Sequence, residues 1–90
     1  MTKAELKAKL EAAIGGTPYG DAVIADLVDN YVEGADKPKY YFTPKDRLDS
    51  RLGFLKGYER VHRNDGKEAM AVAEADKIAI VEKALKALEG

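Results

Sequence analysis

The sequence predicts an all-α protein, a compact four-helix domain with short loops that forms a single unit over residues 1–90. Three observations predict this class. Apolar residues recur at spacings of three and four in four separate stretches, as in helices that bury one face. Two of these stretches begin with Thr-Pro, at 17–18 and 43–44, which is a common helix start. The only strand-like run, residues 39–42, has no second run with which to pair.

The first helix is expected at residues 2–14. Thr2 and Glu5 have the spacing of a capping box, in which each side chain accepts a hydrogen bond from the other residue's backbone N–H. The glycine pair at 15–16 ends the helix. Its apolar face consists of Leu6, Leu10, Ala13 and Ile14.

The second helix is expected at residues 18–33. Thr17 supplies the cap, and Pro18 suits the first helical position. Gly34 is placed to end the helix in a left-handed conformation. The buried face predicted for this helix consists of Val23, Ile24, Leu27, Val28, Tyr31 and Val32.

Residues 35–42 are predicted to form the one long connector, which is both aromatic and basic. Pro38 disfavours helix at the residue before it. Three adjacent aromatic residues at 40–42 stand among lysines at 37, 39 and 45. Such rings can stack on nucleic-acid bases while the lysines meet phosphates. In the alternative that we favour, alternate rings close the end of the bundle and the others stay half exposed.

The third helix, expected at residues 43–63, is the central element of the chain. Thr43 and Pro44 repeat the start signal, and Asp46 opposes the positive end of the helix dipole. At roughly 100° per residue, one stripe of side chains is expected to face the core. The stripe consists of Leu48, Leu52, Leu55, Tyr58 and His62, widened by Phe54 and Val61.

Arg47 and Arg51 project beside this apolar stripe. Because an unpaired guanidinium is costly to bury, we expect both to be paired or to lie at the rim of the core. We predict that Arg51 crosses to an acid of the second helix, with its flat face against an aromatic ring. The acids considered are Asp26, Asp29 and Glu33.

Gly53 and Gly57 line up with Ser50 on another side of the same helix. Each mid-helix glycine costs about 1 kcal/mol relative to alanine. We therefore expect a second helix or a backbone segment to pass close to this ridge. The alternatives are a groove in which a partner approaches the backbone, and a break in the helix.

The last helix is expected at residues 67–89. The link at 64–66, Asn-Asp-Gly, is so short that it favours an antiparallel helix pair. The apolar face predicted for this helix is wide. It would also suit a homodimer, although we expect it to be buried within one chain. Its apolar rows are Ile78, Val81, Leu85 and Leu88, and Ile80, Ala84 and Ala87, with Met70 and Val72 extending the face.

The net charge of −1 conceals two regions of opposite sign. Residues 37–67 carry nine lysines or arginines and four acids, a charge of +5, so the remaining residues carry −6. Residues 21–36 hold five acids and no basic residue. The simplest expectation is that the acidic second helix lies against the basic third one. Alternatively, both faces are exposed and select partners of opposite sign.

Composition and motifs favour a protein without enzymatic chemistry. The chain has no cysteine, which excludes disulfides and thiolate metal sites and fits a cytoplasmic protein. We expect no signal peptide, and no apolar run approaches the roughly 18 residues of a membrane helix. His62 is the only histidine, and Ser50 lies on a different face of its helix, so neither a triad nor a metal motif is apparent. We expect no catalytic residue, no cofactor and no metal.

These observations predict a small protein-binding or adaptor domain whose partner is another protein. Two alternatives stay open: nucleic-acid binding through the basic and aromatic surface at 37–63, and a structural subunit that assembles through the last helix. A small helical protein of a bacterium or a bacterial virus would suit all three. The candidate partner-binding residues are Lys37, Lys39, Tyr40, Tyr41, Lys45, Arg47, Arg51, Lys56, Arg60 and Arg63.

Overall fold

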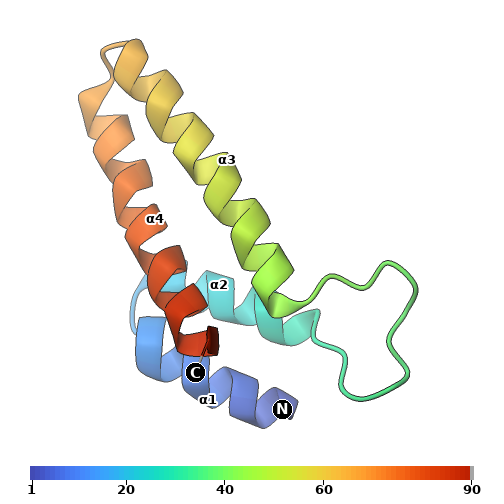
Figure 1. Ribbon diagram of the computed structural model, residues 1–90. Coiled ribbons are helices and arrows are strands. Elements are labelled where there is room, and N and C mark those ends of the chain that lie inside the picture. The colour runs from blue at the N-terminus through green and yellow to red at the C-terminus, as the bar shows by residue number, and fades with distance from the viewer. Residues whose placement is uncertain (90) are drawn as a thin grey trace.

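Four helices form two antiparallel pairs in the computed structural model, which describes residues 1–89 (Figure 1). The structure is 75% helical, and residues 1–89 contain no strand. The all-α class predicted from the apolar periodicity is therefore confirmed. The helices are α1 (Lys3–Ile14), α2 (Pro18–Asp29), α3 (Pro44–Asn64) and α4 (Glu68–Glu89).

The predicted helix starts form the caps expected of them. Thr2 and Glu5 make a capping box at α1, and Thr43 and Asp46 make a second one at α3. The hydroxyl of Thr17 caps α2. These caps satisfy backbone N–H groups that have no acceptor within the helix. Each of the three helices therefore begins within one residue of its predicted start.

The end of α2 differs from the prediction. The backbone N–H and the side-chain amide of Asn30 both donate to the carbonyl oxygen of Asp26, at 3.2 and 2.8 Å. An asparagine that bonds the backbone in this way competes with continuation of the helix. The helix therefore ends at Asp29 instead of residue 33.

The connector is longer than predicted because α2 ends early. It covers residues 30–43 instead of 35–42. Gly34 has the expected positive φ, 75°, but it lies within this connector and does not cap the helix. Tyr31 and Val32, predicted to be buried in α2, are half-buried loop residues.

The α3–α4 hairpin is the long axis of the molecule, and the α1–α2 pair packs across one end of it (Figure 1). α4 contacts all three other helices, and its apolar rows are covered within the chain. The opposite end of the hairpin projects beyond α1 and α2, which makes the molecule 47 × 29 × 20 Å in extent. The buried core consists of Leu6, Leu10, Ile14, Val23, Ile24, Leu27, Leu48, Leu55, Ala71, Ile78, Val81 and Ala84.

The predicted apolar stripe of α3 is buried where it faces α4, the helix against which α3 packs. Leu48 and Leu55 are buried, whereas Phe54, Tyr58 and Val61 are exposed. On α4, Met70 and Val72 are exposed as well. The prediction was wrong for these five residues. Phe54 and Tyr58 lie on the side of α3 toward α2, which does not pack closely against it, and the other three lie toward the projecting end of the hairpin.

The glycine ridge of α3 faces open space. A Cβ atom built at Gly53 or Gly57 would meet no atom within 4 Å, and α3 continues through both positions. The predicted packing partner is absent around these residues, and the predicted break does not occur. The glycine that packing does require is Gly20, where a Cβ would collide with the carbonyl oxygen of Ile14.

Candidate functional site

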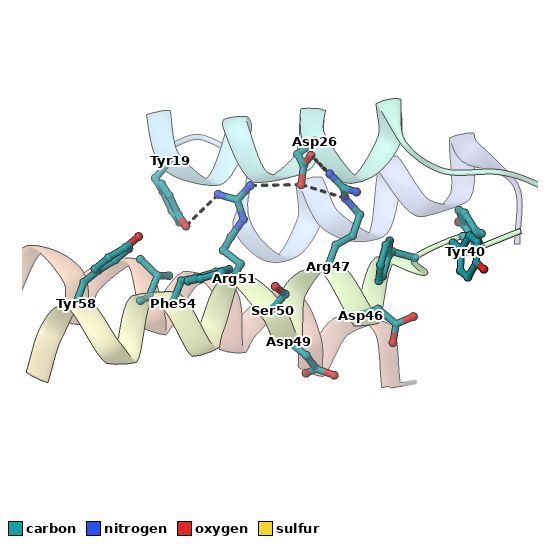
Figure 2. Close-up of a pocket in the computed structure, with 13 residues that line it drawn as sticks. Tyr19, Asp26, Tyr40, Asp46, Arg47, Asp49, Ser50, Arg51, Phe54 and Tyr58 are labelled. Atoms are coloured by element: carbon teal, nitrogen blue, oxygen red, sulfur yellow. Dashed lines mark hydrogen bonds and ion pairs between the residues drawn. The ribbon is translucent and has the colours of Figure 1, made fainter. Parts of the chain in front are cut away.

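An open groove of about 920 Å³ lies between α2, the end of the connector and α3 (Figure 2). The chain has five tyrosines and two phenylalanines, and six of these seven aromatic residues line the groove. They are Tyr19, Tyr40, Tyr41, Phe42, Phe54 and Tyr58. The polar residues that line it are Asp26, Asp46, Arg47, Asp49, Ser50 and Arg51.

Two arginines bridge α2 and α3 at this groove. Arg47 Nη2 lies 2.7 Å from Asp26 Oδ1, and Arg51 Nη2 lies 3.3 Å from Asp26 Oδ2. Figure 2 shows both guanidinium groups reaching from α3 toward the same carboxylate. α2 packs against α1 and α4, and these long side chains, rather than close backbone packing, connect it to α3. The arginines thus span the space that the groove occupies.

The predicted crossing of Arg51 is confirmed, and the aromatic ring involved is that of Tyr19. Arg51 Nη1 donates a hydrogen bond of 3.2 Å to the Tyr19 hydroxyl. The guanidinium carbon lies 5.6 Å from the centroid of the ring, within the range of a cation–π contact. Lys77 of α4 contacts the same ring, with its Nζ at 5.5 Å. Tyr19 therefore joins three helices.

The hydrogen bond from Arg47 holds the pKa of the Asp26 carboxyl below its usual value, against the opposing effect of burial, and Arg51 adds to the lowering. Burial acts to lower the pKa of Arg51, but its contacts with Tyr19 and Asp26 outweigh it and leave that pKa raised. Both shifts favour the ionised forms of Asp26 and Arg51.

The aromatic run of the connector alternates between contact and exposure. Tyr41 is half-buried, and its hydroxyl accepts a hydrogen bond from the N–H of Val32 at 3.2 Å. Tyr40, by contrast, is 81% exposed and has a positive φ of 65°. Phe42 is also exposed. Only the alternation matches the expectation. Tyr41 bonds another connector residue, Tyr40 and Phe42 are mostly exposed rather than half exposed, and all three rings line the groove.

The ten candidate residues do not all meet at one place. Four of them, Tyr40, Tyr41, Arg47 and Arg51, line the groove. Lys45 pairs with Asp49, and Arg63 pairs with Glu59 and Glu68. Lys37 and Lys39 each lie 5.3 Å from a tyrosine ring centroid, those of Tyr41 and Tyr40. Lys56 and Arg60 are exposed, line no part of the groove and have no ion-pair partner among residues 1–89.

The expected neutralisation of the basic third helix by the acidic second one occurs only at Asp26. Asp21 instead accepts a hydrogen bond from the backbone N–H of Gly16 at 3.1 Å, and Glu33 accepts one from the N–H of Lys3. Asp29 has no ion-pair partner among the described residues. Most of the charge of the two segments therefore remains on separate surfaces.

Sequence reasoning missed three aromatic residues of the groove. It assigned Phe54 and Tyr58 to the core and gave Tyr19 no particular role, whereas Phe42 belonged to the aromatic run already considered as a binding surface. The available signal was the arginine pair beside them on α3, because two guanidinium groups next to an apolar stripe mark its edge. How closely α2 packs against that edge, which decides whether it is covered, has no such signal.

His62 lies within the hairpin and away from the groove. Its Nδ1 atom is buried without a hydrogen-bond partner, as is Oε2 of Glu74, and the ring is half-buried. No group of three or more metal-ligating side chains occurs among the described residues. None of the four helices has the length and apolar composition needed to cross a membrane.

Comparison of the chain with known protein families, characterised proteins and solved structures finds no match. The function must therefore be argued from the groove and its residues.

Proposed function

We propose that the protein is a binding domain that docks another protein in the groove between α2 and α3. The observation that carries this proposal is the gathering of six of the seven aromatic residues at one open groove. Tyrosine, phenylalanine and arginine are enriched at protein interfaces, where rigid aromatic side chains supply much of the binding free energy.

The exposure of these rings supports docking over a purely internal role. Phe54 is 64% exposed and Tyr58 is 54% exposed, although both sit on a helix whose neighbouring turns bury leucines. Leaving adjacent aromatic side chains in water forgoes a burial free energy of roughly 1.5–3 kcal/mol each. A partner that covers them would recover part of that free energy.

Nucleic acid is the second candidate, and the paired lysines and tyrosines of the connector favour it. Lys37 and Lys39 each contact a ring, an arrangement that suits stacked bases and nearby phosphates. Against it, the groove has two arginines that share Asp26 and two further acids, Asp46 and Asp49, a charge balance that does not suit a run of phosphates. We therefore rank protein binding first.

Affinity capture with matched variants tests the proposal. Wild-type protein and a Phe54→Ala/Tyr58→Ala variant are immobilised and exposed to lysate of the source cells at moderate salt, with and without nuclease. Val72→Ala, which removes an exposed apolar side chain of α4 outside the groove, is the control. We expect a protein that wild type and the control retain and the double variant loses. Capture that depends on nucleic acid and low salt would favour the second candidate.

A further inference from the structure

The arginine bridge carries an excess of positive charge. Arg47 and Arg51 share the single carboxylate of Asp26, so the three side chains sum to +1. Two other acids line the groove. Asp49 pairs with Lys45 at 2.8 Å, and Asp46 accepts a hydrogen bond from the N–H of Thr43 at the positive end of the α3 dipole. Figure 2 shows both carboxylates directed away from α2, whereas the arginines reach toward it. A negatively charged group is therefore attracted at the arginine pair itself.

Both guanidinium groups retain N–H donors for such a group. Arg47 donates to Asp26 through Nε and Nη2, while Arg51 donates to Asp26 through Nη2 and to Tyr19 through Nη1. A guanidinium has five N–H donors, and these contacts use two on each arginine. With 31% of each arginine side chain exposed, the remaining donors are open to a carboxylate, whose planar shape matches the guanidinium fork.

Aromatic side chains lie on both sides of the arginines along the groove. Phe54 and Tyr58 follow them on α3 (Figure 2), and Phe42, which precedes the helix, lines the same groove. From Asp46 to Tyr58, α3 rises by about 18 Å at 1.5 Å per residue. Another helix of about three turns fits this length, with its apolar side chains against the rings and one polar position opposite the arginines.

We propose that the groove binds an amphipathic helix of a partner protein that presents one aspartate or glutamate between apolar anchors. This proposal rests on the protein-binding function above and adds the chemistry of the partner. The acidic side chain meets the free donors of Arg47 and Arg51, and the anchors cover Phe42, Phe54 and Tyr58.

A second copy of the folded chain is a poorer occupant. The helices of this chain already bury their apolar faces in the core, so the acids of α2 stand on a surface that offers few large apolar side chains. Among the described residues, the exposed large apolar side chains outside the groove are Met1, Val61, Met70 and Val72. On α4, Met70 and Val72 are two residues apart and so point about 160° apart around the helix. Among residues 1–89, no exposed helix face outside the groove therefore presents an acid between two large apolar side chains.

Selection from a peptide library tests the proposal with the intact protein. Random peptides of about 16 residues, roughly four helical turns, are displayed and selected on the full chain. Selected peptides are then measured against wild type, Phe54→Ala/Tyr58→Ala and Val72→Ala. We expect sequences with apolar residues at helical spacing around one acid, which bind wild type and Val72→Ala alike and lose at least tenfold in affinity on the double variant.

A matched pair of peptides then measures how much the charge of the acidic side chain contributes to binding. Replacing the selected acid by its amide, Glu→Gln or Asp→Asn, should weaken binding roughly tenfold or more, as expected for loss of a charged hydrogen bond. Because the change is made in the peptide, the fold of the protein is unaffected. The same substitution should also reduce the salt dependence of binding.

The other outcomes separate the two proposals. Groove-dependent peptides that lack an acid, or that bind equally well as amides, overturn the acidic-helix proposal and leave the protein-binding function standing. Peptides that bind the double variant as well as wild type count against both proposals. A wild-type dimer that Phe54→Ala/Tyr58→Ala converts to a monomer, measured by sedimentation, would show that a second copy occupies the groove and would overturn the partner-helix proposal.

Discussion

Replacing Gly53 and Gly57 by alanine should stabilise the protein. A Cβ at either position meets no atom within 4 Å, so the added methyl group causes no clash. Alanine is favoured over glycine in a helix by about 0.8–1.0 kcal/mol. The double variant should therefore gain roughly 2 kcal/mol. That is a large fraction of the 5–15 kcal/mol typical of a domain.

Urea unfolding followed by circular dichroism at 222 nm measures this gain. The midpoint should rise with no change in slope, since the surface exposed on unfolding is almost the same. In a thermal experiment, each kcal/mol corresponds to roughly 4–8 °C for a domain of this size. The control is Gly20→Ala on α2, where the added Cβ collides with the backbone oxygen of Ile14. The same chemical change should lower stability there, by roughly 1–3 kcal/mol.

A lower midpoint for Gly53→Ala or Gly57→Ala would refute the reasoning, because it would mean that something packs against the ridge. Repeating the experiment at several protein concentrations identifies the cause. A destabilisation that grows with protein concentration points to a second chain on this face, since association contributes to stability by mass action.

Four further predictions follow from the fold and the arginine bridge. Far-ultraviolet circular dichroism should give a helix content well above half, and a sheet-dominated spectrum would contradict the fold. A double-mutant cycle of Arg51→Gln with Asp26→Asn should give a coupling free energy above roughly 0.5 kcal/mol, whereas the same cycle with Asp29→Asn should give none. Because the pKa of folded Asp26 is depressed, the stability that this residue contributes is present above its ordinary pKa of 3.8 and is lost as pH falls through the folded value. Asp26→Asn should therefore flatten the acid side of a stability–pH profile, and an unchanged profile would contradict the bridge. Finally, duplex DNA should bind no more tightly than micromolar at physiological salt. A sub-micromolar affinity that falls steeply with salt would favour the nucleic-acid alternative.

The elements of the fold were predictable because their signals are local. Thr2, Thr17 and Thr43 each cap the helix that the sequence assigns to them, and a cap depends on residues within one turn. The end of α2 was missed because the prediction used Gly34 as the stop signal and did not consider Asn30, four residues earlier. In the folded chain, Asn30 ends the helix four residues before Gly34.

The groove was only partly predictable because its borders are set by long-range packing. The charge argument found Arg51 and its crossing to α2, since a guanidinium beside leucines must be paired somewhere. Periodicity alone could not separate Leu55, which is buried, from Tyr58, which is exposed. They are three residues apart, so their directions differ by about 60° around α3, and the placement of α4 and α2 around the helix decides which of the two is covered.

Beyond Tyr58, the projecting end of the α3–α4 hairpin is held together by two helices alone. Segments with so few buried contacts open locally at a lower free energy than the whole domain, and their amide hydrogens exchange sooner. Slow exchange is therefore expected around Leu48 and Val81, which are fully buried, and faster exchange toward Val61 and Val72, which are exposed. A partner resting on Phe54 and Tyr58 would restrain those openings. Exchange of the amides at the hairpin tip would then report occupancy of the groove without any label on either molecule.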